Sequence, residues 1–174
     1  MAIQAGTYKF GPDNASLHVE TTRSGAAAKA GHDLVIDVSS WEATLEVGDS
    51  PRLALSADPT SLKVREGKGG MQALKDDDKE DIHKTIDKDV LKKKDIRFTS
   101  STVEAAGDGL KVSGDLELGG KSKPITFDVS ESGGTVTGSA DIKQTDWGIK
   151  PYSALFGALK VNDEVKVVVE GKLA

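Results

Sequence analysis

The sequence predicts an all-β protein, an eight-stranded antiparallel barrel with one amphipathic helix and a short helical turn. Three observations predict this fold. Most of the chain alternates apolar and polar residues, short glycine turns separate the alternating runs, and one segment has helical spacing instead. Strands joined by short turns favour an antiparallel meander over a crossover fold. With 174 residues the chain can bury a sizeable core, and we expect one domain over residues 1–174.

Period-two alternation marks the strands of the first half. In "SLHVET" Leu17 and Val19 share one face, and "RLALSA" repeats the pattern. In "LVIDVSSWEATLEV" the apolar positions change parity after Val38 and resume at Trp41. We therefore expect a β-bulge near positions 39–40, which would bend a long strand as barrel closure requires.

The second half contains strands punctuated by glycine turns. The runs "IRFTSSTVEA" and "LKVSGDLEL" flank residues 107–109, and Gly119-Gly120 separates the latter run from "PITFDVS". Gly133-Gly134 then leads into "TGSADIKQTDWGI", and the chain ends with the alternating run "EVKVVVEGKLA". These runs complete the predicted count of about eight strands.

One segment has the four-residue spacing of a helix. From about 75 to 91, "KDDDKEDIHKTIDKDVL" places Ile82, Ile86 and Val90 four apart, with acidic residues at its start and lysines just past its end. These charges complement the helix dipole, and the narrow apolar stripe suits a lid or plug on one end of the barrel. A shorter helical turn is predicted near 152–159.

Composition excludes several classes of function. The formal charge of −5 argues against nucleic-acid partners and anionic membrane surfaces, which attract basic proteins. Without cysteine the chain forms neither disulfides nor thiolate metal sites. No stretch approaches the roughly 20 apolar residues of a membrane-spanning helix. We expect a cytoplasmic protein as the sequence is written, and a periplasmic or extracellular one if a leader has been removed; monomer or homodimer stays open.

The sequence contains no recognisable motif for catalysis, metal binding or phosphate binding. His32 and Asp33 form a pair suited either to acid–base chemistry or to bracing a turn, and bracing is the commoner use. His18, His32 and His83 lack the short spacing of metal ligands, so no metal or cofactor is expected. The glycine loop at 67–70 lacks the phosphate-loop spacing and precedes three aspartates. No nucleophile elbow occurs.

The aromatic residues concentrate in the second half of the chain. They either fill the core of a small barrel or line an apolar cavity. About eight strands is the size at which a barrel is either filled by its own side chains or able to hold one small ligand. The residues concerned are Phe98, Phe127, Trp147, Tyr152 and Phe156.

Several stretches resemble the YceI-like polyisoprenoid-binding family. They are "GPDNASLHVE", "ADPTSLKV", "VLKKKDIRFTSSTV", "GDLELGGKSKPITFDV", "ADIKQTDWGI" and "GALKVNDEVKVVVEGKL". The turn at Gly120–Pro124 and the corner at Asp146–Ile149 are the most specific pieces, and the resemblance spans Thr7 to Leu173. It implies an extended lipocalin-like barrel whose apolar channel holds a polyisoprenoid, isoprenoid quinone or fatty-acid-like lipid.

Strand parity then predicts which residues would line such a channel. The candidates are Leu17, Val19, Leu34, Ile36, Val38, Phe98, Leu116, Phe127, Ile142, Trp147, Leu155, Phe156 and Leu159. A polar head would remain near the channel mouth, for which the candidates are His32, Lys150 and Tyr152.

Two other functions stay open. One is an enzyme that acts on a hydrophobic substrate in the same pocket, with His32 and Asp146 as acid–base groups. The other is a barrel without ligand that serves as a stress or interaction module.

Overall fold

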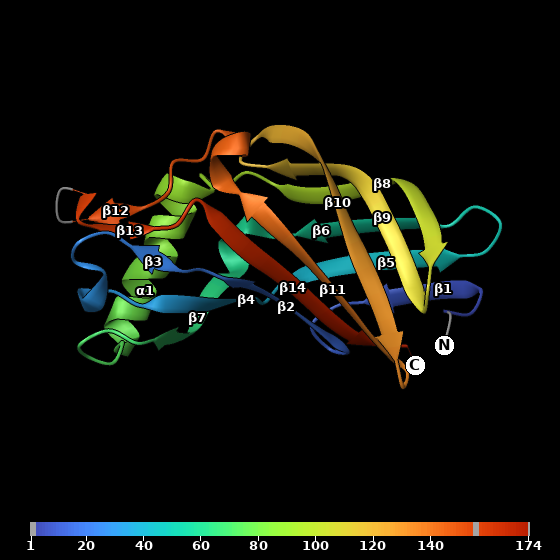
Figure 1. Ribbon diagram of the computed structural model, residues 1–174, viewed down its shortest axis with the longest axis horizontal. Helices are drawn as coiled ribbons and strands as arrows, with labels where there is room; N and C mark the ends of the chain where they lie inside the picture. Colours follow the sequence, from blue (N-terminus) through green and yellow to red (C-terminus); the bar gives the residue numbers. More distant parts are fainter. Residues whose placement is uncertain (1–2, 155–156, 174) are drawn as a thin grey trace.

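The alternating stretches form strands, and most of the strands join one curled antiparallel sheet (Figure 1). The computed structural model describes residues 3–154 and 157–173. In the order in which they pair, the strands of the main sheet are β1 (Gly6–Phe10), β5 (Trp41–Val47), β6 (Arg52–Ala57), β8 (Ile96–Ala106), β9 (Gly109–Leu118), β10 (Lys121–Ser132), β11 (Thr135–Lys143), β14 (Glu164–Lys172), β2 (Ala15–Glu20), β4 (Asp33–Val38) and β7 (Leu62–Lys68).

The main sheet has eleven strands, so the expected count of eight is wrong. The difference arises because three long stretches are each broken into two successive strands: β1 with β2, β4 with β5, and β6 with β7. Each half pairs with the matching half of its neighbour, β1 with β5 and β2 with β4, then β5 with β6 and β4 with β7. The two halves of a broken stretch, such as β1 and β2, therefore lie toward opposite edges of the sheet although they are close in sequence. The sheet must curl like a barrel to bring these edges near each other.

The parity change near residues 39–40 is a break between strands, so the expected β-bulge is wrong. The Ser39 N–H donates to the carbonyl oxygen of Ser61 at 3.0 Å, and the Asp58 N–H donates to that of Ser40 at 2.9 Å. Across the break lies a short 3-10 turn, η2 (Pro59–Ser61), capped by the carboxylate of Asp58, which accepts from the N–H of Thr60. Hydrogen bonds from the Thr60 hydroxyl and N–H lower the pKa of Asp58. These bonds satisfy the backbone N–H and C=O groups at the two adjacent breaks, between β4 and β5 and between β6 and β7.

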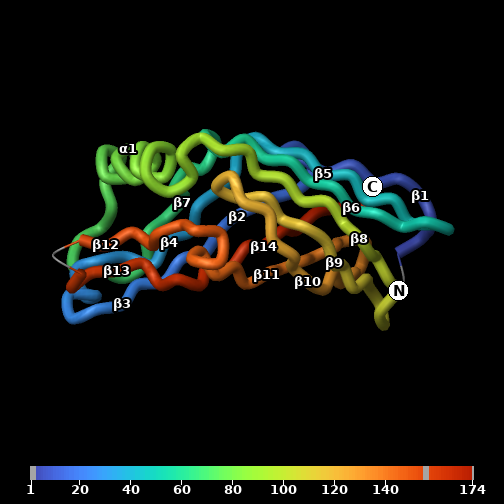
Figure 2. Tube along the Cα trace, turned by 90° about the horizontal axis from the view of Figure 1, so that it is seen from above, coloured from blue at the N-terminus to red at the C-terminus, as the bar shows by residue number. Residues whose placement is uncertain are grey.

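The helix expected over 75–91 is present. It consists of α1 (Asp76–Thr85) and a π-helical continuation, η3 (Ile86–Val90). The Lys75 N–H donates to the Asp78 carboxylate at 2.9 Å, which fixes the first turn. Figure 2 shows the helix lying along one end of the elongated molecule, beside β7.

Of the helical turn expected near 152–159, the described residues retain only Gly157, which is 3-10 helical, and strands lie on either side of it. Ser153 and Ala154 form strand β12 (Ser153–Ala154), which pairs with β13 (Leu159–Val161), and β13 pairs in turn with β3 (Arg23–Ser24). Leu155 and Phe156 lie outside the described residues. The pairing with β3 joins residues far apart in sequence, so the local pattern of a short apolar run cannot predict it.

The small sheet and the helix stand at the same end of the molecule (Figure 1). The described residues also include the 3-10 segments η1 (Ala28–Ala30) and η4 (Gln144–Trp147). Buried apolar residues form two clusters, one centred on Ile36, Trp41 and Ile142 and one on Phe98, Val103 and Val112. Among residues 3–154 and 157–173, no helix is long and apolar enough to cross a bilayer.

Candidate ligand-binding cavity

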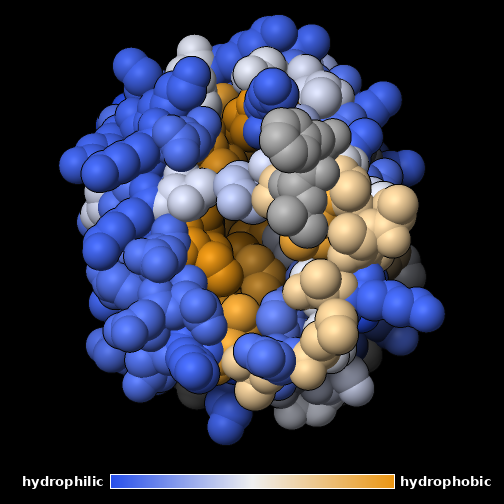
Figure 3. Space-filling view, turned by 90° about the vertical axis from the view of Figure 1, so that its left-hand side faces the viewer, coloured by the Kyte–Doolittle hydropathy of each residue, from blue (hydrophilic) through white to orange (hydrophobic). Residues whose placement is uncertain are grey.

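The interior of the curled sheet holds a cavity of about 1050 Å³. That volume is at the upper end of the roughly 300–1,000 Å³ of small-molecule pockets. Apolar side chains from both core clusters line most of it. Figure 3 views the molecule from the helix end and shows strongly hydrophobic residues inside a hollow, with hydrophilic residues along its left rim and moderately hydrophobic ones along much of its right rim. The cavity is therefore apolar within and open at this end.

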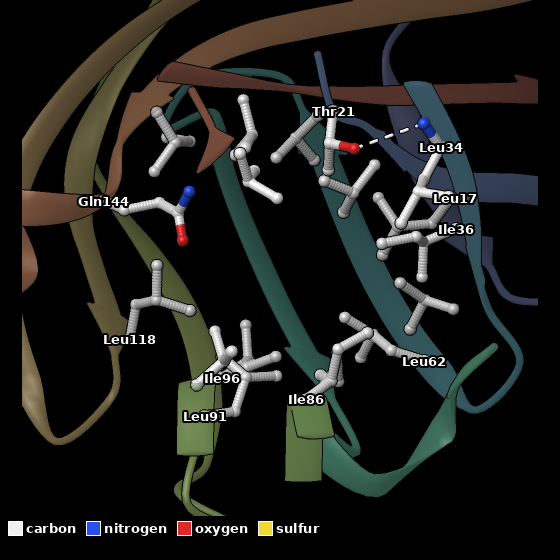
Figure 4. A pocket seen from close by; sticks show the side chains of 18 of the residues that line it. Leu17, Thr21, Leu34, Ile36, Leu62, Ile86, Leu91, Ile96, Leu118 and Gln144 are labelled. Atoms are coloured by element: carbon white, nitrogen blue, oxygen red, sulfur yellow. Dashed lines mark hydrogen bonds between the residues drawn. The ribbon is translucent and has the colours of Figure 1, made fainter. Parts of the chain in front are cut away.

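Strand parity explains most of the wall. Inward-facing residues recur every second position along β2, β4, β11 and β14 because successive strand side chains point to opposite faces. The structure places ten of the predicted channel residues in the wall: Leu17, Val19, Leu34, Ile36, Val38, Phe98, Leu116, Phe127, Ile142 and Leu159. Figure 4 shows the pocket from close by, with Leu17, Leu34 and Ile36 along one side. Contact of these residues with a ligand stays a prediction.

Trp147 is buried but does not line the cavity. It ends η4, where Gly148 adopts a left-handed φ of 71° and turns the chain. Its indole N–H donates to the carbonyl oxygen of Leu116 at 2.9 Å. Trp147 thus ties the corner after β11 to the wall strand β9 from behind.

Trp147→Phe is expected to lower the free energy of unfolding by about 1–3 kcal/mol without changing the uptake of hydrophobic ligands. The variant removes the indole donor from the part-buried carbonyl group of Leu116, and phenylalanine keeps most of the packing. Chemical denaturation and a ligand-displacement assay measure the two effects.

Trp41→Phe is the matched control. Trp41 is equally buried, but in the described part of the chain its indole nitrogen has no hydrogen-bond partner. Its replacement should cost less stability than that of Trp147. Equal losses for both variants would show that the bond to Leu116 contributes nothing.

The channel mouth contains two of its three predicted residues. His32 and Tyr152 line the cavity opening, whereas Lys150 is exposed and lies outside the lining. A ring nitrogen of His32 lies 2.6 Å from the carbonyl oxygen of Gln72, so that nitrogen carries the proton, and the histidine braces the loop before the helix. Asp33 accepts from the N–H of Arg23 at 3.0 Å.

Apolar groups are exposed at this same opening. Met71 is 80% exposed and Tyr152 is 50% exposed, and both line the cavity. They are the exposed large hydrophobic residues among those the structure describes. Arg23 also reaches the opening, where its guanidinium donates to the carbonyl oxygens of Gly31 and Lys68, each at 2.8 Å.

The helix covers part of the cavity. Ile82, Ile86 and Val90, the apolar stripe predicted from sequence, all line it. His83 Nδ1 lies 2.6 Å from the carbonyl oxygen of Leu62 at the start of β7, and His83 Nε2 lies 3.7 Å from the Asp87 carboxylate. The contact with Leu62 holds the helix against the sheet, and the contact with Asp87 lies within the helical segment.

Gln144 is a cavity residue that strand parity did not select. It follows Ile142 by two positions and so shares its face, but it is polar and falls in the corner η4.

Asp163 stabilises this corner, because its carboxylate accepts hydrogen bonds from the N–H and the hydroxyl of Thr145 at 2.8 and 2.5 Å. The hydroxyl bond is the main reason that the pKa of Asp163 is lowered.

The proposed acid–base pair is not assembled in the cavity. His32 lines the opening, whereas Asp146 is exposed on η4 and lies outside the lining. Within the described ranges, no group of three or more histidine or acidic side chains is placed to hold a metal ion. The arrangement is suited to burying an apolar molecule.

Comparisons with known proteins agree with this architecture. The chain is similar in fold to a crystal structure of Burkholderia cenocepacia BcnA, with a TM-score of 0.65, 17% identity, and coverage of 90% of this chain and 94% of that one. It is also similar to a mutant Campylobacter jejuni YceI protein, with a TM-score of 0.55, 16% identity, and coverage of 75% and 78%. No curated protein matches. The profile of the YceI-like domain matches residues 8–173, and the chain therefore belongs to the YceI-like family.

Proposed function

We propose that the protein binds a long-chain hydrophobic ligand in its cavity and carries or sequesters it. The ligand would be a polyisoprenoid, an isoprenoid quinone or a fatty-acid-like lipid. One observation carries this proposal: an apolar cavity of about 1050 Å³ extends through both core clusters and opens at the helix end. A protein with no use for this space would gain stability by filling it, because empty volume forfeits packing contacts.

The energetics of such binding need no polar recognition. Burying a methylene group contributes about 0.8 kcal/mol, so a five-carbon isoprenoid unit contributes up to about 4 kcal/mol before ordering costs. A few units would offset the loss of translational and conformational freedom. The apolar wall formed by β2, β4, β11 and β14 supplies the surface that such a chain requires.

The opening suits transfer of the ligand. Met71 and Tyr152 extend the apolar lining outward past the rim, so a chain that enters or leaves keeps apolar contacts over a longer path. The helix lies over the same end and is tied to β7 by His83. The entrance would therefore lie between the helix and the small sheet of β3, β12 and β13.

Native mass spectrometry of freshly purified protein tests the proposal. We expect an added mass in the lipid range, lost on collisional activation and restored when delipidated protein is incubated with geranylgeraniol. Repeated absence of any bound mass, together with failure to take up geranylgeraniol, farnesol or a long-chain fatty acid, would contradict it.

A further inference from the structure

Two polar residues interrupt the apolar cavity wall. Four polar or charged residues are buried among those described, and two of them, Thr21 and Gln144, line the cavity. Each is only 8% exposed. Figure 4 shows both among the aliphatic side chains of the pocket. A polar group in an apolar wall is costly unless something pairs with it, and both side chains have a protein partner: Thr21 pairs with Leu34 and the Gln144 nitrogen with Asn162.

The orientation of the Gln144 amide is fixed. Its Nε2 donates to the carbonyl oxygen of Asn162 at 3.2 Å, and a carbonyl oxygen can only accept, so the nitrogen must stand on that side. The backbone is held as well, because the Gln144 N–H donates to the carbonyl oxygen of Asp163 and the Ile149 N–H donates to that of Gln144. The amide oxygen therefore occupies a defined place in the cavity wall.

This amide oxygen is an acceptor without a donor. Across the described residues, the side-chain hydrogen bond of Gln144 is the one through its nitrogen. In Figure 4 the side chain extends into the pocket between Leu118 and the opposite wall. A ligand that carries an O–H or N–H group would satisfy this oxygen; a pure hydrocarbon would leave it unpaired.

Thr21 is the other buried polar residue of the lining, and Figure 4 shows it across the pocket from Gln144. Its hydroxyl oxygen accepts from the N–H of Leu34 at 3.2 Å, which leaves the hydroxyl proton available for donation. The charged residues of the lining, among them Arg23, Lys75 and Asp78, come from β3 and the start of the helix at the opening. The two polar groups inside the wall are thus neutral.

We propose that the Gln144 amide oxygen forms a polar subsite for a neutral head group that donates a hydrogen bond, and that the preferred ligand is a long-chain alcohol. This inference rests on the proposed function. A hydroxyl can donate to the Gln144 oxygen, whereas an ether or a pure hydrocarbon cannot. A quinone oxygen only accepts, so it would leave the Gln144 oxygen unpaired, and a phosphate or carboxylate would bring an uncompensated charge beside apolar side chains.

Binding of matched ligands to the unaltered protein is the first test. Geranylgeraniol and its methyl ether share a chain and an oxygen, but the ether has no proton to donate. We expect the alcohol to have a Kd about tenfold lower than that of the ether, as one hydrogen bond to an acceptor in an apolar cavity allows. Geranylgeranyl monophosphate should bind more weakly than the alcohol.

Two results would overturn the subsite. Equal affinities of alcohol and ether would show that the Gln144 oxygen recognises nothing. Tightest binding by the monophosphate, with the advantage lost in Arg23→Gln, would place an anionic head at the opening instead. If neither alcohol nor ether binds at all, the proposed function itself fails, which is a distinguishable outcome.

Substitution of Gln144 is the second test. Gln144→Leu should remove the preference for the alcohol while the ether binds as well as before or better, because the unpaired acceptor has gone. Gln4→Leu, at an exposed position outside the cavity, is the matched control and should keep the preference. If Gln144→Leu does not fold by thermal unfolding, Gln144→Met replaces it. A retained tenfold preference in a folded variant would overturn the assignment of Gln144.

Discussion

Ile142→Asp is expected to abolish the uptake of a long hydrophobic chain. Ile142 is 2% exposed, lines the cavity and stands opposite Val165 of β14. A carboxyl group here would either be charged among aliphatic side chains or be protonated and unpaired, and both states disfavour an apolar ligand beside it. Loss of the isoleucine packing should also cost about 3 kcal/mol or more of unfolding free energy. Ligand displacement and urea denaturation measure the two effects.

Two further variants separate charge from packing and from general damage. Ile142→Ala removes a similar amount of packing without adding a polar group, so it should lose stability yet keep uptake. Thr102→Asp adds the same carboxylate at an exposed position of β8 and should change neither. A folded Ile142→Asp protein that takes up the chain normally would mean that the assigned wall is wrong.

Strand parity is why so much of the wall could be predicted from sequence. Residues such as Leu17, Val19 and Ile36 lie in strands whose alternation is unbroken, and a single buried face then fixes every second side chain. The helix was equally readable, because its stripe of Ile82, Ile86 and Val90 has a period found in no strand.

The corner after β11 and the rim could not be predicted in this way. Trp147 lies in a 3-10 turn, where neither period applies, and a bond to distant Leu116 turns it away from the cavity. Ser153 and Ala154 are extended because a strand from the first quarter of the chain extends their sheet. The breaks that raise the strand count depend on bonds such as that from Ser39, between β4 and β5, to Ser61 of η2. Each miss thus depends on long-range pairing.

Ala43→Phe is expected to shorten the channel and so to change which chain lengths bind. Ala43 of β5 is buried and lines the cavity, opposite Phe10 of β1 and Leu55 of β6, which also line it. An aromatic ring here would enter space that the ligand is proposed to use, so a long chain could no longer pass this level. Each five-carbon unit kept out forfeits up to about 4 kcal/mol of burial. Affinity for geranylgeraniol should therefore fall by orders of magnitude.

The chain-length dependence is what distinguishes a blocked channel from a damaged protein. Geraniol, which is half as long, should bind Ala43→Phe about as well as it binds the unaltered protein, because it can stay on the open side of the ring. Ala54→Phe makes the same substitution at an exposed position of the neighbouring strand β6 and should leave both affinities unchanged. Insertion of the ring into free space should also cost less unfolding free energy than the roughly 1–3 kcal/mol of overpacking a filled core, and it can even stabilise the protein.

Unchanged binding of geranylgeraniol would mean that the chain does not reach Ala43, while equal losses for both alcohols would point to a distorted wall. Only a selective loss of the longer alcohol fits a single continuous channel that is filled from the helix end.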